Sequence, residues 1–204
     1  MRPGEGERRD IDRDERRAVE RALRATGDVR SILDVGCGNG RWMTTLAAKK
    51  PAFLVALDCS QAELVTARAS GGGPDAPGFS VLCADAGALP LRPQSFDLVL
   101  CLGVMPHVRR TGRLRALREM RRVTTRWVIV EYCHTEGMSF LWQRLRQRLG
   151  LPARFPRNHL SSREIEGEFR RAGLGIRGFA RVGGMFSRTW VVLAEAPSPD
   201  WMKH

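Results

Sequence analysis

The chain has 204 residues, 43% of them apolar, which suits one domain with a sizeable core and leaves little room for a second. No stretch approaches about eighteen uninterrupted apolar residues, so we expect no membrane-spanning helix. The charged N-terminus lacks the apolar core of a secretory signal, and we therefore expect a cytoplasmic protein. Five cysteines without paired spacing predict free thiols, and neither a disulfide framework nor a metal site.

The formal net charge is +12 and the isoelectric point is near 10.9. Arginine supplies all but three of the 34 basic residues. One interpretation is a compositional bias toward arginine that has no functional meaning. The other is an anionic partner, such as nucleic acid, a membrane surface or a phosphorylated or carboxylated substrate.

Residues 1–10 are predicted to form a flexible charged arm, and residues 11–25 a helix with a sparse apolar stripe that ends at Gly27. Strands and helices then alternate, and the strands are continuously apolar, as in a parallel sheet covered on both faces. The expected strands are 31–35, 53–57, 79–83, 96–102 and 127–132. The expected helices between them are 41–49, 61–69 and 110–122.

The C-terminal part follows a different pattern. An amphipathic helix is expected at 139–149, an irregular segment at 151–158 and another helix at 162–172. Two strands, 176–181 and 189–194, follow with a glycine turn between them. A closing pair of this kind places one antiparallel strand near the edge of the sheet.

A glycine-rich turn follows the first strand, with the sequence L-D-V-G-C-G-N-G at positions 33–40. Glycine lets the backbone turn sharply and approach a ligand closely, and the N-terminus of the helix that follows offers unpaired N–H groups. Asp58 stands at the end of the second strand, where a carboxylate can accept both hydroxyls of a ribose. The pattern predicts a nucleotide-type cofactor at this edge of the sheet.

Two cofactors compete for this loop. A dinucleotide fingerprint needs its third glycine at position 41, where this chain has Arg41. Asp34, at the start of the loop, suits the ammonium group that S-adenosylmethionine carries and a dinucleotide lacks. The spacing therefore favours S-adenosylmethionine, and NAD is the alternative.

The G-x-G-x-G spacing, with Asp34 two residues before it, resembles the first motif of the class I S-adenosylmethionine-dependent methyltransferases. Later blocks resemble the small-molecule, quinone-modifying group of that family. They are D-A-G-A-L-P-L at 85–91, S-F-D-L-V at 95–99 and C-L-G-V-M-P-H-V at 101–108. The similarity covers about residues 30–132. It departs from the family at Pro106, which replaces a histidine, and at 123–126, where V-T-T-R replaces Pro-Gly-Gly.

The resemblance implies a Rossmann-like, doubly wound and mostly parallel seven-stranded sheet with one antiparallel strand near the edge. It implies a single α/β domain over residues 11–204, with a lid or substrate insert at about 135–161. The basic amphipathic helix at 139–149 would then be a lid. A peripheral contact with an anionic membrane or an acidic partner is the other interpretation.

The resemblance also implies a site for S-adenosylmethionine, with S-adenosylhomocysteine as the product. Asp34 would face the ammonium, Asp58 the ribose hydroxyls and Asp85 the adenine amino group. The implied cofactor residues all lie at strand ends or in the loops after them: Asp34, Gly36, Cys37, Gly38, Gly40, Asp58, Cys59, Asp85, Ala86, Cys101 and Leu102.

Methyl transfer from a sulfonium depends mainly on alignment and on exclusion of water, and a general base helps when the acceptor is a hydroxyl. His107, after the fourth strand, is the candidate base or orienting group; a histidine that merely begins a helix fits equally well. Tyr132 and His134, at the end of the fifth strand, are candidate substrate residues together with His107.

The leading hypothesis is an enzyme that methylates a small molecule at oxygen, with a lipophilic or anionic acceptor. An RNA methyltransferase, supported by charge alone, and a binding protein that has lost turnover are the alternatives. All five cysteines stand at strand ends. This suits a small residue in a tight turn, and a thiol-based metalloid site is the other interpretation. The acceptor and the oligomeric state do not follow from the sequence.

Overall fold

The computed structural model describes residues 5–70, 79–135, 148, 150, 159–182 and 189–197, without the side chains of 5–11 and 70. The predicted helix at 139–149 lies outside the described residues except for position 148, and so does the irregular segment at 151–158. Most of the expected insert at 135–161 therefore also lies outside them.

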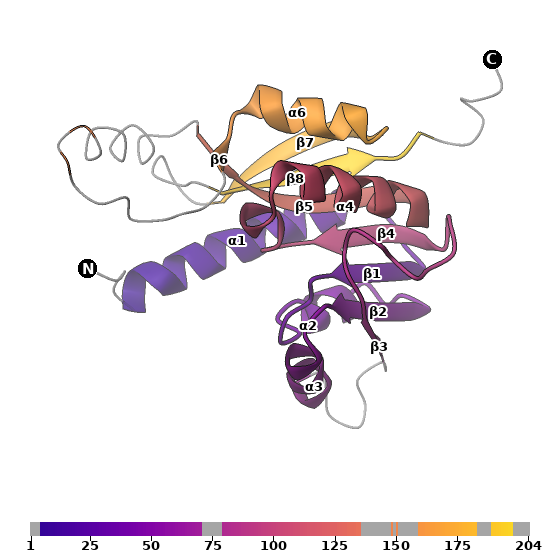
Figure 1. Ribbon diagram of the computed structural model, residues 1–204. Coiled ribbons are helices and arrows are strands. Elements are labelled where there is room, and N and C mark those ends of the chain that lie inside the picture. Colours follow the sequence, from indigo (N-terminus) through magenta and orange to yellow (C-terminus); the bar gives the residue numbers. More distant parts are fainter. Residues whose placement is uncertain are drawn as a thin grey trace, which may run out of the picture.

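One mixed sheet runs through the molecule in the order β3-β2-β1-β4-β5-β8-β7 (Figure 1). Strand β8 is antiparallel to both of its neighbours, β5 and β7, while the pairs from β3 across to β5 are parallel. The prediction of a mostly parallel sheet with one antiparallel strand near the edge is confirmed. The strands are β1 Ser31–Val35, β2 Phe53–Asp58, β3 Ser80–Cys83, β4 Phe96–Cys101, β5 Thr124–His134, β7 Gly175–Val182 and β8 Thr189–Glu195.

An additional strand, β6 (His159–Leu160), pairs in parallel with β5 at Cys133 and His134. Two residues carry no periodic signal, so the sequence did not predict it. Strand β5 is also longer than expected, because its pairing with β8 continues as far as Cys133. The end of β5 is thereby held between two neighbouring strands.

Most helix bounds agree with the periodic apolar pattern. The helices are α1 Glu5–Ala25, α2 Met43–Ala47, α3 Gln61–Ser70, α4 Arg110–Val123 and α6 Ser162–Arg171, with a 3₁₀ turn η1 at Met105–His107. Helix α1 begins at Glu5, inside the segment expected to be a flexible arm. Its acids and arginines alternate, and pairs such as Arg17 with Asp14 and Arg24 with Glu20 support the helix. Helix α2 is shorter than expected because the glycine turn extends toward it.

The helices cover both faces of the sheet. Figure 1 shows α4 and α6 on one side, where their apolar residues join the cluster around Leu33, Val99 and Val130. Helix α1 packs on the other side, and its residues Ala18 and Val19 join the cluster around Ile32. Strand β1 is buried along its whole length, as expected for the centre of a doubly wound sheet. None of the described helices is long and apolar enough to cross a membrane.

A buried ion pair ties the α4–α6 side together. The guanidinium of Arg113 lies 2.7 Å from the carboxylate of Glu168, and both side chains are at most 5% exposed. The Tyr132 hydroxyl donates to Glu168 at 3.2 Å, and Arg113 also donates to the Val108 carbonyl at 2.9 Å. Burial of two charges costs solvation free energy that good geometry must offset. The network joins β5, α4, α6 and the segment that follows η1.

Candidate functional site

The glycine loop between β1 and α2 is anchored to the end of β2. The N–H groups of Gly36 and Cys37 both donate to the carbonyl of Leu57, at 2.6 and 3.0 Å. Gly36 has a φ of +75°, and a Cβ at this position would collide with Cγ2 of Val104. Glycine is therefore required here both for its backbone conformation and for the close approach of the segment after β4.

Asp58, at the end of β2, also holds the glycine loop in place. Its two carboxylate oxygens accept hydrogen bonds from the backbone N–H groups of Gly38 and Ser60, each at 2.9 Å. A carboxylate oxygen accepts more than one hydrogen bond, so these contacts leave capacity for the hydroxyls of a ribose. The sequence indicated a ligand role for Asp58. The structure adds a structural role in fixing the glycine loop.

Asp34 lies at the centre of the site and is 1% exposed. Its Oδ2 atom is buried and accepts no hydrogen bond from any described residue. Burial raises the pKa of Asp34 from 3.8 to about 7, and the negative charge of Asp58 adds to this increase. A buried carboxylate without a partner is unfavourable unless a cation or a donor meets it.

These features fit S-adenosylmethionine. The unsatisfied oxygen of Asp34 is suited to the ammonium group of an amino acid, and Asp58 faces the turn where a ribose can be held. Asp85 is exposed after β3, and its Oδ1 accepts the N–H of Gly87 at 2.8 Å. Ala86 beside it is partly buried. The three acids thus stand at the carboxyl ends of three adjacent strands.

Four further hydrogen bonds shape the site, and the sequence did not reveal them. Glu131 at the end of β5 accepts the N–H of Gly103 at 2.7 Å, which holds the segment after β4. On the other flank, Glu119 accepts the N–H of Leu89, while Arg122 donates to the Leu89 and Leu91 carbonyls, all at 2.8 Å. These contacts join positions at least 28 residues apart, and no local motif encodes them.

The cysteines near the loop are neutral thiols. Burial, followed by the nearby charge of Asp34, raises the pKa of Cys37 to about 12 and that of Cys101 further still. Cys59 and Cys83 are exposed, and the Cys83 thiol lies 3.7 Å from the Cys59 carbonyl. Because the thiolate is the form that binds metals or attacks substrates, the buried pair is suited to packing. Leu102, next to Cys101, is buried as well.

The three candidate substrate residues lie in different environments. His107 is exposed, at the end of η1. Tyr132 is fully buried in the hydrophobic core, and burial together with the charge of Glu168 raises its pKa well above 10. His134 is 2% exposed and stacks on Trp190, with ring centroids 4.3 Å apart. Among them, His107 has the exposure that a group contacting an acceptor needs; the substrate roles of all three stay predictions.

Arg41 has a clear place in the structure. Its guanidinium forms ion pairs with Glu15 and Asp12 of α1, at 2.8 and 3.2 Å, and lies over the ring of Trp42. The residue that is incompatible with a dinucleotide fingerprint therefore fastens α1 to the end of the glycine loop. This contact places the N-terminal half of α1 beside the site.

Comparison with known proteins agrees with this geometry. Residues 32–126 match the family model described as a methyltransferase domain. The chain is 33% identical over 78 residues to a ubiquinone biosynthesis O-methyltransferase of Neisseria meningitidis, covering 38% of this chain and 33% of that protein. It is 30% identical over 87 residues to a tRNA U34 carboxymethyltransferase of Desulfotalea psychrophila, covering 43% and 27%. These matches span a third or less of either relative.

Among solved structures, the fold is similar to the magnesium protoporphyrin IX methyltransferase of Synechocystis with bound S-adenosylhomocysteine. The TM-score is 0.78 at 17% identity, covering 97% of this chain and 90% of that one. The strand order, the glycine loop and these matches define a methyltransferase-type α/β domain. Residues 32–126 belong to the methyltransferase-domain family, and the chain shares its fold with S-adenosylmethionine-dependent methyltransferases. The predictions of a methyltransferase, of a Rossmann-like fold and of S-adenosylmethionine as the cofactor are confirmed.

We predict that Asp34→Asn stabilises the cofactor-free protein at neutral and alkaline pH. The folded chain holds the Asp34 proton more tightly than the unfolded chain, so its stability is fully present below about pH 4 and is lost as the pH increases to about 7. Without this titration, the free energy of unfolding at about pH 8 should exceed that of the wild type by at most about 4 kcal/mol. Urea denaturation at about pH 4 and pH 8 measures the difference. If Asp34→Asn and the wild type had equal free energies of unfolding at both pH values, the raised pKa of Asp34 would be contradicted.

Asp58→Ala should weaken S-adenosylhomocysteine binding by about 10- to 100-fold, because the variant loses charge-assisted hydrogen bonds to ligand and loop. Calorimetry measures the affinity, with Asp28→Ala as the control, because Asp28 is exposed and precedes the end of β1 opposite to the loop. Neither wild type nor control should bind NAD detectably. Unchanged affinity in Asp58→Ala, or tighter binding of NAD than of S-adenosylhomocysteine, would show that the loop is misassigned.

Proposed function

We propose that the protein is a cytoplasmic enzyme that transfers a methyl group from S-adenosylmethionine to an oxygen atom of a small molecule. The observation that carries the proposal is the buried, unpartnered Oδ2 of Asp34 below a glycine loop. The partial match to a ubiquinone biosynthesis O-methyltransferase supports oxygen as the acceptor atom. Free thiols at all five cysteines suit a reducing compartment.

The residues would divide the work between binding and orientation. Asp34, Asp58 and Asp85 would hold the amino-acid, ribose and adenine parts of the cofactor, with the loop residues 36–40 and Cys59, Ala86, Cys101 and Leu102 around them. When bound, S-adenosylmethionine supplies an already activated methyl group. The protein then has to align the acceptor oxygen and keep water out.

His107 is proposed as the group that orients the acceptor hydroxyl and accepts its proton. The residue follows β4 on a short turn, where an imidazole stays exposed toward the carboxyl ends of the strands. A neutral imidazole nitrogen can accept a proton from a hydroxyl and so serve as a general base. Tyr132 is poorly suited to this task, because its raised pKa keeps the phenol protonated and its hydroxyl donates to Glu168.

A second candidate function is methylation of RNA. Helix α4 carries six arginines and one glutamate, whereas α1 balances seven arginines with seven acids. The positive charge is therefore concentrated, which favours an anionic partner. The partial match to a tRNA-modifying enzyme points the same way. A steep decrease in RNA affinity with increasing salt would support this candidate.

To test the leading proposal, the release of S-adenosylhomocysteine is measured with phenols, carboxylic acids, amines and thiols of similar size as acceptors. We expect turnover with an oxygen acceptor and a decrease of about 100-fold in kcat for His107→Ala, in the range of general base catalysis. Asp28→Ala, an exposed residue before β1, serves as the control and should retain kcat. Turnover restricted to amines or thiols, or full activity in His107→Ala, would contradict the proposal.

A further inference from the structure

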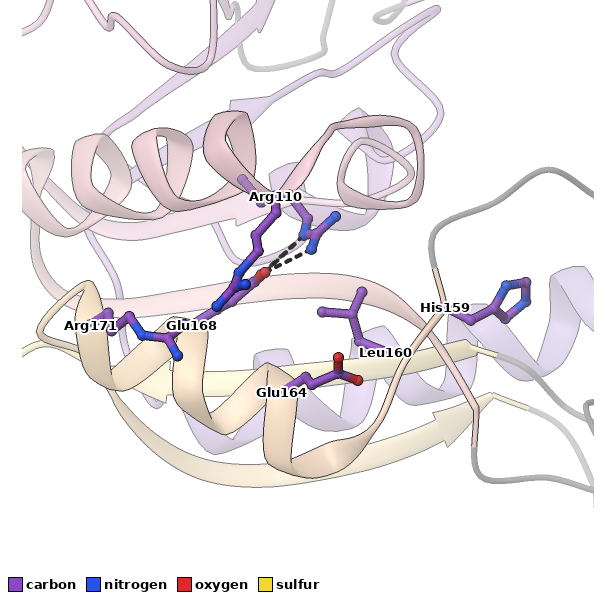
Figure 2. Close-up of a pocket in the computed structure, with 7 residues that line it drawn as sticks. Arg110, His159, Leu160, Glu164, Glu168 and Arg171 are labelled. Atoms are coloured by element: carbon purple, nitrogen blue, oxygen red, sulfur yellow. Dashed lines mark hydrogen bonds and ion pairs between the residues drawn. The ribbon is translucent and has the colours of Figure 1, made fainter.

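A cavity of about 410 Å³ opens between α4 and α6, on the side of the sheet that carries the Arg113–Glu168 ion pair (Figure 2). Its volume lies in the usual range for small-molecule sites. Charged side chains make up most of its wall. The lining residues are Arg110, Arg113, His159, Leu160, Glu164, Glu168 and Arg171.

The two acids in this wall are already engaged within the protein. Glu168 accepts three hydrogen bonds from Arg113, at 2.7 to 3.2 Å, and one from Tyr132. Glu164 closes the capping box of α6 and accepts the N–H and the hydroxyl of Ser161, each at 2.8 Å. Neither carboxylate therefore forms an ion pair with the remaining arginines in the described part of the chain.

Arg110 of α4 and Arg171 of α6 are the two arginines that remain. Neither forms a hydrogen bond or an ion pair with another side chain in the part of the chain that the structure describes. Figure 2 shows Arg110 extending from α4 and Arg171 from α6, both near the paired Glu168. The hydrogen bonds from Ser161 lower the pKa of Glu164, and the charge of Arg110 adds to this decrease, so Arg110 and Glu164 interact electrostatically. The wall still carries three arginines against two glutamates, and this excess of positive charge on a concave surface attracts an anion.

The cavity also lies beside the candidate active site. Arg113 donates to the carbonyl of Val108, the residue directly after His107. His159 pairs with Cys133 at the end of β5. The wall of the cavity is thus continuous with the segment that carries His107 and with the edge of the sheet where substrates of open α/β folds bind.

We propose that this cavity binds a carboxylate or phosphate group of the methyl acceptor, with Arg110 and Arg171 as its binding residues. The guanidinium fork matches both groups through paired N–H donors. Arg113 acts as a positioning residue. Its guanidinium is already paired with Glu168 and donates to the Val108 carbonyl, so it connects the cavity wall to the segment that follows η1. The inference rests on the proposed function for the identity of the ligand, while the anion site itself rests on the cavity.

The test uses benzoate and phenyl phosphate as probes, titrated calorimetrically into the full chain at constant ionic strength. The cavity variant is Arg110→Gln with Arg171→Gln. The matched control is Arg118→Gln with Arg170→Gln, which removes the same charge from exposed positions of the same two helices outside the cavity. We expect saturable binding of at least one probe, weakened at least about 10-fold in the cavity variant and less than about twofold in the control.

The relative affinities of the two probes distinguish a carboxylate from a phosphate ligand. Equal weakening in the two double variants would overturn the proposal, because the effect would then come from general surface charge. Absence of saturable binding for both probes would overturn it as well. S-adenosylhomocysteine affinity should be unchanged in both variants. Failure of the wild type to bind S-adenosylhomocysteine would instead refute the proposed function. The anion titration would still show whether the cavity binds an anion.

Discussion

The organisation of the site depends on one carboxylate that the fold buries without a partner. Asp34 lies in the interior strand β1, paired in register with Ala56 of β2 and Leu100 of β4. It is 1% exposed, and no described side chain or backbone N–H donates to its Oδ2. The fold accepts this cost in its cofactor-free state, and a cationic ligand would remove it. Such stored destabilisation is common where binding is the purpose of a residue.

The surrounding contacts keep this carboxylate in a fixed place. Asp58 fastens the glycine loop on one side, and Glu131 fastens Gly103 on the other. Each anchor is itself an acid, so the loop is held while the local potential stays negative. A negative pocket suits a ligand with an ammonium and a sulfonium group better than one with a pyrophosphate. The same arrangement is the electrostatic basis for the predicted preference over NAD.

Charge has the opposite sign on the α4–α6 side of the sheet. There the arginines of α4 outnumber its acids, and Arg110 and Arg171 line a cavity whose wall has three arginines and two glutamates. The molecule thus separates a negative site at the glycine loop from a positive one beside η1. An acceptor with an anionic group would be drawn to the second site and kept away from the first. The fold thus shows where part of the excess positive charge lies, which the composition alone does not show.

Local signals explain what could be predicted from the sequence. The continuous apolar run of β1, the glycines at 36, 38 and 40 and the acids at strand ends are patterns within a few residues, and they identified the sheet and the cofactor loop. The two-residue β6, the early start of α1 and the Arg113–Glu168 pair depend on contacts between distant segments. Composition showed excess arginine, and only the fold shows which arginines lack partners.

The most direct test of this account counts protons during binding. S-adenosylhomocysteine is titrated into the wild type by calorimetry in two buffers that differ in ionisation enthalpy. Because Asp34 is mostly protonated at about pH 6 without ligand and must ionise to meet an ammonium, we predict release of nearly one proton there and almost none at about pH 8.5. Asp34→Asn should release none at either pH. Binding that releases no proton at about pH 6 in the wild type would contradict the account.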